Sequence, residues 1–311
     1  MQIGLIGLGR MGFNMARRWL GGKHTVVAYN RSAQKAEAIA DHGAVAAPTL
    51  ASLVERLAAP RVVWLMLPAG QIVDDHLNQL AALLAPGDLI VDGANGHFRD
   101  AQRRAEKLRA HRIGFIDAGV SGGIWGLKNG YCTMVGGDAA DVRRIEPLLN
   151  TLAPEDGFLH AGPVGAGHFL KMTHNGIEYG LMQAYAEGFE LLNASELHYD
   201  LKAVAALWNR GSVVRSWLLE LMERALDRDP QLASLKARVD DSGEGRWTVQ
   251  QAVELGVPVP AITAAVFQRF ASRQEDGFGL RVLAALRREF GGHAVTPADR
   301  ESPSTVTDQS A

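Results

Sequence analysis

Residues 3–12 read Ile3-Gly4-Leu5-Ile6-Gly7-Leu8-Gly9-Arg10-Met11-Gly12, and this stretch decides the fold of the N-terminal half. A short apolar run leads directly into a G-x-G-x-x-G motif, and a helical pattern follows over residues 13–20. This order supplies the tight turn, the close backbone approach and the helix N-terminus that a pyrophosphate requires. The motif therefore predicts a dinucleotide site formed by Gly7, Leu8, Gly9, Arg10, Met11 and Gly12.

Short apolar strands alternate with helical segments in the next part of the chain. We expect strands at residues 25–29, 61–67, 89–91, 114–118 and 131–135, and helices at 33–42, 50–57, 72–84, 99–109 and 141–152. This alternation predicts an α/β, Rossmann-type, doubly wound parallel sheet over residues 1–164.

The second half is almost entirely helical in pattern. A glycine-rich entry leads into a long helix that ends near residue 193, and further helices are expected at 201–209, 213–226, 232–239, 248–255, 259–272 and 279–290. Residues 165–295 are therefore predicted to form an all-α C-terminal domain. Residues 296–311 are rich in Ser, Thr, Asp and Pro and are predicted to be a disordered tail.

The composition excludes several classes of protein. A net charge of −2 and a pI near 6.6 give no reason to expect nucleic acid or a membrane surface as a partner. Cys132 is the only cysteine, so no intrachain disulfide forms, and we expect no metal site. Neither a signal peptide nor an apolar run long enough for a membrane span is expected, and the prediction is a cytoplasmic protein.

The end of the second strand bears on the choice of cofactor. Asn30, Arg31 and Ser32 follow that strand, Lys35 lies one helical turn further, and no acidic residue stands where an adenosine ribose would need one. Arg31 offers a planar fork suited to a 2′-phosphate. We predict NADP as cofactor, and NAD stays possible if Arg31 only faces solvent.

The helix after residue 165 carries the densest set of candidate chemical groups. Lys171, His174, Asn175, Glu178 and Tyr179 share one helix face, and Lys171 and Glu178 lie two turns apart, about 10 Å of rise. A solvated helix face would be the plain interpretation. Apolar residues around the rest of the helix predict burial instead, and charged groups on a buried helix are paired, neutralised or used in chemistry.

Two further patterns suggest recognition of a small acidic molecule. The glycine-dense stretch 119–126 exposes backbone N–H groups and the Ser121 hydroxyl, although a plain flexible turn remains an alternative. Three separate arginine clusters occur in a chain of near-neutral charge. They place Arg215 inside an apolar helix, Arg246 and Thr248 in a glycine-flanked loop, and Arg287 and His293 at a helix end. Any one of them could be an ordinary surface arginine, but the three clusters together are what capture of a phosphorylated sugar acid would need.

Taken together, these residues resemble the decarboxylating 6-phosphogluconate dehydrogenases in their short-chain bacterial form, within the 3-hydroxyacid dehydrogenase superfamily. The most specific segments are residues 121–126 (Ser-Gly-Gly-Ile-Trp-Gly), 167–180, 213–216 and 246–248. The resemblance implies oxidative decarboxylation of 6-phosphogluconate to ribulose 5-phosphate, a step of the pentose phosphate pathway. It also implies that Lys171 is the general base and later acid, and that Glu178 is the general acid.

The resemblance also assigns binding residues. It implies sugar-acid contacts from Asn95, Ser121, Gly122, Gly123, His174, Asn175 and Tyr179, and phosphate contacts from Arg215, Arg246 and Thr248. Arg287 and His293 match a segment that reaches in from a neighbouring subunit, which implies a homodimer or homotetramer with a shared site. Cofactor contacts are implied for the first glycine loop, Asn30, Arg31, Ser32, Leu67, Ala69 and Asn95.

The chain departs from the family pattern at two places. The turn Asp92-Gly93-Ala94-Asn95-Gly96 usually reads Asp-Gly-Gly-Asn-Ser in the family, and Arg246 occupies a position that is often Lys. Two alternative functions stay open. One is a 3-hydroxyacid dehydrogenase of the hydroxyisobutyrate or tartronate semialdehyde type, and the other is a non-catalytic NADP-binding protein.

Overall fold

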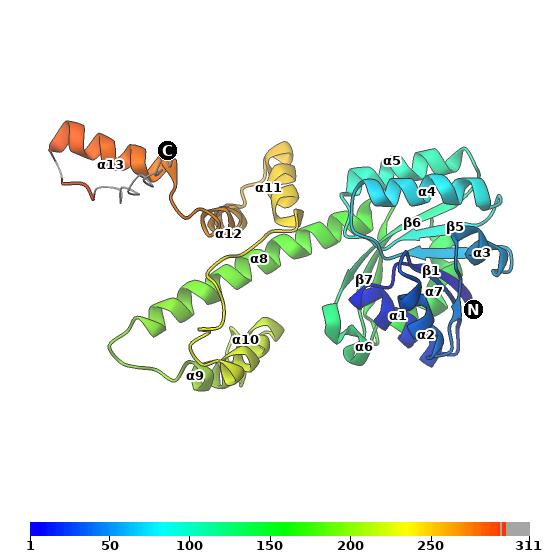
Figure 1. The fold of residues 1–311 in the computed structure, drawn as a ribbon, viewed down its shortest axis with the longest axis horizontal. Coiled ribbons are helices and arrows are strands. Elements are labelled where there is room, and N and C mark those ends of the chain that lie inside the picture. Colours follow the sequence, from blue (N-terminus) through cyan, green and yellow to red (C-terminus); the bar gives the residue numbers. More distant parts are fainter. Residues whose placement is uncertain (293, 297–311) are drawn as a thin grey trace, which may run out of the picture. The chain divides into compact units, whose positions relative to one another are not determined.

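An eight-stranded sheet forms the N-terminal half of the computed structural model, in the order β3-β2-β1-β4-β5-β6-β7-β8 (Figure 1). The structure describes residues 1–292 and 294–296. The strands are β1 (Gln2–Ile6), β2 (Thr25–Tyr29), β3 (Val45–Ala46), β4 (Val62–Leu65), β5 (Leu89–Asp92), β6 (Gly114–Ser121), β7 (Cys132–Gly137) and β8 (Phe158–Gly162). The strand order reverses between β1 and β4, and this switch point is where doubly wound sheets bind dinucleotides.

The predicted doubly wound α/β sheet is confirmed, with one difference in strand direction. Every neighbouring pair is parallel except β6 and β7, which run antiparallel with Ser121 opposite Cys132. The connection from Ser121 to Cys132 holds only η1 (Gly123–Trp125) and the one-turn helix α6 (Gly126–Asn129). A parallel pair needs a crossover of a dozen or more residues, so this short connection returns the chain in the opposite direction. Strands β3 and β8 were not expected, because β3 is only two residues long and His160 interrupts the apolar run of β8.

Helices cover both faces of the sheet (Figure 1). Alternate strand residues point to opposite faces and form two separate cores. One face packs against α1 (Arg10–Gly21), α2 (Ala33–Ala40) and α7 (Ala139–Leu152), and the other against α3 (Leu50–Glu55), α4 (Gln71–Leu83) and α5 (Phe98–Arg109).

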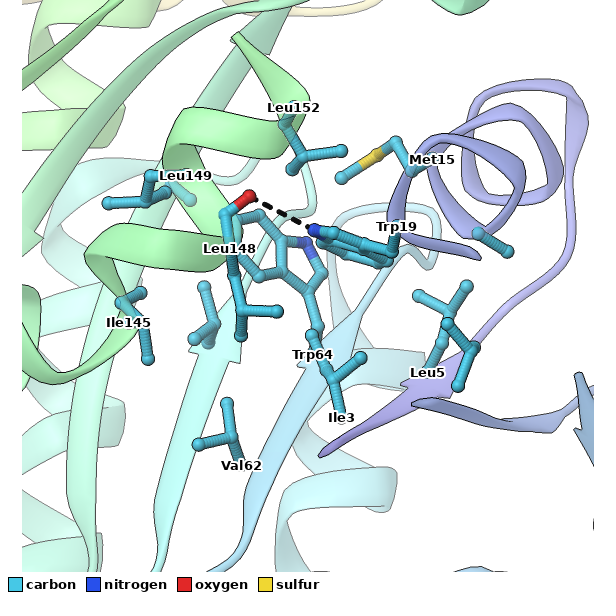
Figure 2. Close-up of a cluster of buried hydrophobic side chains, with 14 of the residues drawn as sticks. Ile3, Leu5, Met15, Trp19, Val62, Trp64, Ile145, Leu148, Leu149 and Leu152 are labelled. Atoms are coloured by element: carbon cyan, nitrogen blue, oxygen red, sulfur yellow. Dashed lines mark hydrogen bonds between the residues drawn. The ribbon is translucent and has the colours of Figure 1, made fainter. Parts of the chain in front are cut away.

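Two buried tryptophans lie at the centre of the first core (Figure 2). The rings of Trp19 and Trp64 meet edge to face, with centroids 5.3 Å apart. The Trp19 indole N–H donates to the Leu148 carbonyl at 3.1 Å, so its one polar atom is satisfied inside the core. This contact joins α1, which follows the glycine motif, to α7 on the same face of the sheet.

Helix α8 (Ala166–Asn193) opens the second half and is seated against β6 and β7. The buried Asp117 carboxylate on β6 accepts hydrogen bonds from the Gly165 N–H at 2.6 Å and the His168 N–H at 2.7 Å. These are unpaired donors at the helix N-terminus, so a side chain from the sheet caps the helix. Burial raises the pKa of Asp117, and the charge of His168 opposes this rise.

The remaining described helices are α9 (Leu201–Trp208), α10 (Trp217–Arg228), α11 (Glu244–Leu255), α12 (Pro260–Ala271) and α13 (Phe278–Gly291). Within the described residues the second half contains no strand, which confirms the all-α prediction. No helix of that described part combines the length and apolar character that a membrane crossing needs.

Two helix starts and one whole helix in this half were predicted wrongly. Helix α10 begins at Trp217, not at residue 213, because the Ser216 side chain accepts from the Leu219 N–H and caps it there. Residues 232–239 form turns, not a helix, in part because Asp229 accepts from the backbone and hydroxyl of Ser234. Helix α11 begins at Glu244, four residues earlier than expected.

The chain divides into two compact units. The first contains residues 1–235 and 241–266, and the second contains residues 236–240 and the chain from residue 267 onward. Inside the second unit, Arg269 donates to the Asp240 carbonyl and the Val239 N–H donates to Ser272. His293 and residues 297–311 of the predicted tail lie outside the described residues.

The packing of α8 on the sheet gives a prediction for Gly167→Ala. A Cβ at Gly167 would lie 2.5 Å from the Asp117 carbonyl oxygen and 2.6 Å from the Met134 carbonyl oxygen, and neither backbone group can turn away. We expect the free energy of unfolding to fall by about 1–3 kcal/mol in urea denaturation. Gly188→Ala on the same helix is the matched control, since a Cβ there meets nothing within 4 Å, and it should stabilise by up to about 1 kcal/mol. Equal effects of the two substitutions would contradict this account.

Candidate active site

The glycine loop between β1 and α1 has the shape that a pyrophosphate needs. Gly7 has a φ of +98°, and a Cβ there would lie 2.3 Å from the Met66 carbonyl oxygen, while a Cβ at Gly12 would lie 2.1 Å from the Gly7 carbonyl oxygen. At Gly9 a Cβ would meet nothing within 4 Å, so the backbone is open at the N-terminus of α1. The Leu8 N–H donates to the Asn30 side chain at 2.9 Å, which holds the loop against the end of β2. These residues fit a dinucleotide.

The other predicted cofactor residues lie at the carboxyl ends of neighbouring strands. Arg31, Ser32 and Lys35 are exposed just beyond β2, and Arg10 is exposed on the first turn of α1. Beyond β4, Leu67 is half-buried and lies beside the loop, since its side chain would be 3.2 Å from a Cβ at Gly7, and Ala69 is exposed.

The turn after β5 carries Asn95, which is half-buried. A buried ion pair holds this turn in place. Arg104 Nη1 lies 3.0 Å from one oxygen of the Asp92 carboxylate, and the other oxygen accepts from the Ala94 N–H. Arg104 also donates to Asp74 and to the Gly70 carbonyl. Its hydrogen bond to Asp74 lowers the pKa of that carboxyl group to about 2. Sequence reasoning missed this network, because Arg104 lies within an otherwise ordinary charged helix.

Lys171 is the most unusual charged group of α8. Its side chain is only 5% exposed, and its Nζ donates to Asn175 Oδ1 at 2.7 Å and lies 3.5 Å from His174 Nδ1. Burial lowers the pKa of Lys171, while the nearby charges of Glu178, Glu244 and Cys132 oppose that shift. A lysine in this environment can release its proton closer to neutral pH than a lysine in water.

His174 connects this lysine to the glycine-dense loop. Its Nε2 lies 3.4 Å from the Ser121 hydroxyl, and its Nδ1 lies 3.0 Å from Asn175 Oδ1 and 3.9 Å from Glu178 Oε2. The structure therefore brings Lys171, His174, Asn175, Glu178 and Ser121 together, although they come from α8 and the end of β6. Glu178 is part-exposed, so its carboxyl group has access to a bound molecule.

The glycines that follow Ser121 need their lack of a side chain. Gly122 and Gly123 have φ values of +133° and +52°. The buried Tyr131 ring lies beneath this loop, where a Cβ at Gly126 would come within 2.0 Å of it. Gly123 itself is exposed, and a Cβ there would meet nothing within 4 Å. The loop therefore has a backbone conformation that favours glycine at residues 122 and 123, and its outer surface at Gly123 is open.

Tyr179 and Thr248 lie in the contact between α8 and α11. Tyr179 is buried, and its hydroxyl accepts from the Ser242 N–H at 3.3 Å. The buried Thr248 hydroxyl lies 2.9 Å from the Met172 carbonyl oxygen and 2.8 Å from that of Glu244, so its proton is used within the protein. The expectation of a loop at Arg246 and Thr248 is wrong, because α11 already includes both residues.

The predicted phosphate arginines have different surroundings. Arg246 Nε pairs with Asp241 at 2.8 Å, and its side chain is half-exposed. Arg215 is exposed in the turn before α10, and the expectation that it lies inside a helix is wrong for the capping reason given above. Arg287 is exposed on α13 in the second unit.

Sequence reasoning also missed Glu244. It is 5% exposed, receives a hydrogen bond from the Ser242 hydroxyl and acts electrostatically on Lys171. The sequence feature that could have identified Glu244 was its position between Gly243 and Gly245, in the segment selected for Arg246. Among the residues that the structure describes, no three His, Cys, Asp or Glu side chains are grouped so that they could hold a metal ion.

Comparison with known proteins assigns both halves of the chain to the same family. A family model for the NAD binding domain of 6-phosphogluconate dehydrogenase matches residues 2–162, and a model for the C-terminal domain of 6-phosphogluconate dehydrogenase matches residues 167–294.

Two individual relatives match over nearly their whole length. The NAD(+)-dependent, decarboxylating 6-phosphogluconate dehydrogenase of Haloferax volcanii is 45% identical over 301 residues, which covers 96% of this chain and all of the relative. The YqeC protein of Bacillus subtilis is 44% identical over 294 residues, 94% of this chain and 99% of the relative. Among solved structures, Plasmodium falciparum 6-phosphogluconate dehydrogenase aligns with a TM-score of 0.81 at 27% identity, over 97% of this chain and 67% of its own. This chain belongs to the 6-phosphogluconate dehydrogenase family.

Proposed function

We propose that this chain oxidises and decarboxylates 6-phosphogluconate to ribulose 5-phosphate and carbon dioxide, with NADP as the acceptor. The observation that carries the proposal is the buried Lys171 amine, which has a lowered pKa and lies beside His174 and Asn175 on the helix that also presents Glu178. Two relatives add support. The Haloferax volcanii protein is named as a decarboxylating enzyme, and the Plasmodium falciparum structure is described in complexes with NADP+ and with 6-phosphogluconate.

In the proposed reaction, Lys171 takes the proton of the 3-hydroxyl group. When bound along the glycine loop, the nicotinamide cofactor would supply the acceptor for the hydride of carbon 3. The resulting 3-keto acid loses carbon dioxide readily, because its carbonyl group takes up the electron pair that the broken bond releases. Protonated Lys171 then stabilises the negative oxygen of the enediolate. The hydrogen bond from Nζ to Asn175 orients the amine for both steps.

Glu178 completes the reaction in this proposal by protonating carbon 1 of the enediol. It stands one helical turn beyond His174 and two turns beyond Lys171, so acid and base approach the substrate from different points along α8. Its part-exposed carboxyl group can exchange its proton with solvent between turnovers.

The substrate contacts are proposed residue by residue. Asn95, Ser121, Gly122, Gly123, His174, Asn175 and Tyr179 would hold the sugar acid, and Arg246, Thr248 and Arg215 its phosphate. Arg246 pairs with Asp241, and its side chain is 52% exposed, so its guanidinium group is accessible to a phosphate. Arg287 and His293 of a second copy would complete the site, so we propose a homodimer or a homotetramer. We also propose that the nucleotide domain ends at residue 164 and that the enzyme works in the cytoplasm.

The cofactor would lie along the glycine loop of residues 7–12, with Asn30, Leu67, Ala69 and Asn95 beside it. Arg31, Ser32 and Lys35 would hold the 2′-phosphate of NADP, because their exposed side chains follow β2 without an acidic residue. The NAD dependence named for the Haloferax volcanii relative keeps NAD as a second cofactor to be tested.

We expect Lys171→Met and Glu178→Gln each to lower kcat for 6-phosphogluconate by about 10²- to 10⁴-fold. Carbon dioxide and reduced cofactor are measured together, with NADP and NAD in parallel. Lys128→Met, a change at an exposed lysine of α6, is the control and should leave both unchanged. Oxidation of unphosphorylated 3-hydroxy acids in place of 6-phosphogluconate would instead favour the superfamily alternative.

Arg31→Ala tests the proposed 2′-phosphate contact. Losing one charge-assisted contact of about 1.5–3 kcal/mol should raise the KM for NADP by about 10- to 100-fold. The KM for NAD should stay as it is, because NAD has no phosphate at that position. Arg109→Ala, at an exposed arginine on α5, should change neither value. A parallel change in both KM values would show that Arg31 does not read the 2′-phosphate.

Glu244→Gln should shift the pH dependence of kcat/KM for 6-phosphogluconate. Activity requires the neutral form of Lys171, so the rate rises as the pH increases through the pKa of that lysine. The Glu244 carboxylate raises this pKa, and its removal lowers it. The rising limb should therefore move to lower pH. An unmoved limb, or one moved to higher pH, would exclude Lys171 as the titrating base.

A further inference from the structure

His168 is a buried side chain between the proposed catalytic helix and the turn that carries Asn95. It lies in the first turn of α8, three residues before Lys171, and is 1% exposed. Its backbone N–H donates to Asp117 on β6, and its ring Nε2 lies 3.1 Å from the Asp92 carbonyl oxygen at the end of β5. Because a carbonyl oxygen only accepts, Nε2 carries a proton and donates it.

The Asp92 residue, whose carbonyl oxygen accepts from this ring, is itself held by hydrogen bonds through its side chain. The Asp92 carboxylate is held by Arg104 and by the Ala94 N–H. The turn returns directly over the ring, since a Cβ at Gly96 would lie 3.4 Å from His168 Cε1 and 3.5 Å from Nδ1. One imidazole therefore contacts both ends of the segment from Asp92 to Gly96, with Asn95 inside it.

His168 and Lys171 lie one helical turn apart on α8, so the ring and the lysine keep a constant position relative to each other. A Cβ at Gly119 would lie 2.3 Å from the Lys171 Cβ, so the lysine stem lies directly on β6. Movement of the first turn of α8 would change how much water reaches the Lys171 amine. His168 Nδ1 has no hydrogen-bond partner among residues 1–292 and 294–296. Within these residues, the ring therefore makes its hydrogen bond through Nε2 alone.

We infer that His168 is a positioning residue, whose Nε2–H bond to the Asp92 carbonyl sets the placement of the Asn95 turn relative to the Lys171 amine. The inference rests on the proposed function for its kinetic consequence, because Asn95 and Lys171 would act on the same substrate. The effect of His168 on the burial of Lys171 does not depend on which substrate is bound.

Two amide substitutions separate the hydrogen bond from packing. His168→Gln places an amide N–H near the position of Nε2 and can still donate to Asp92, whereas His168→Asn places its amide near Nδ1 and cannot. Both bury one amide, so the two variants are matched in polarity. His168→Leu has nearly the shape of Asn without the amide, and it carries the test if the Asn variant fails to fold.

In the full-length enzyme with 6-phosphogluconate and NADP, the Gln variant should keep a kcat close to wild type. The Asn and Leu variants should lose about 10- to 100-fold in kcat through misplacement of the reacting groups. Melting temperatures are measured beside the kinetics. Equal losses in the Gln and Asn variants, or a kcat that simply follows the melting temperature, would overturn the inference.

A second measurement needs no substrate. The rate at which an amine-reactive reagent labels Lys171, followed by mass spectrometry, should be low in the wild type and the Gln variant and higher in the Asn and Leu variants. Failure of the wild type to turn over 6-phosphogluconate would count against the proposed function alone. Equal labelling of Lys171 in all four proteins would count against the role of His168.

Discussion

The structure depends on the capping of α8 by a carboxylate that belongs to the sheet. Asp117 is fully buried on β6 and accepts from the backbone N–H groups of Gly165 and His168. A buried charge is costly unless it is paired and hydrogen-bonded, and the positive end of a 28-residue helix supplies both kinds of compensation. The proposed catalytic residues are on this helix, so one buried contact fixes their direction relative to the strand ends where a dinucleotide would lie.

Close approach of backbones makes this contact possible. Gly119, Gly136 and Gly167 meet where α8 crosses β6 and β7, and a Cβ at any of them would lie within about 2.7 Å of a neighbouring atom. The close approach buries the stem of Lys171 against β6, and burial lowers the pKa of its amine. The proposed general base is therefore a product of packing, because burial would not lower the pKa of the same lysine on an exposed helix.

The contact between α8 and α11 gives a structural role to two residues that were selected from the sequence as substrate contacts. Thr248 and Tyr179 are buried there and use their hydroxyl groups in bonds to backbone groups. Gly176 and Gly245 let the two helices approach, since a Cβ at either would collide with Thr248 or Tyr179. These residues therefore hold the Arg246 segment against the proposed catalytic helix, whatever contact they make with a substrate. Glu244 enters the electrostatics of Lys171 by the same route.

The sequence by itself determined the fold class and the chemical groups of the candidate site. The G-x-G-x-x-G motif between a strand and a helix, the alternating strands and the face that carries Lys171, His174, Asn175 and Glu178 follow from local spacing, which a linear pattern records. Only the tertiary structure decided the antiparallel pairing of β7, the capping by Asp117, the burial of His168 and the start of α10. These features join residues that lie tens of positions apart or depend on a competing local cap. The free energy of such contacts comes from what surrounds each residue in the folded chain, and a pattern along the sequence does not contain it.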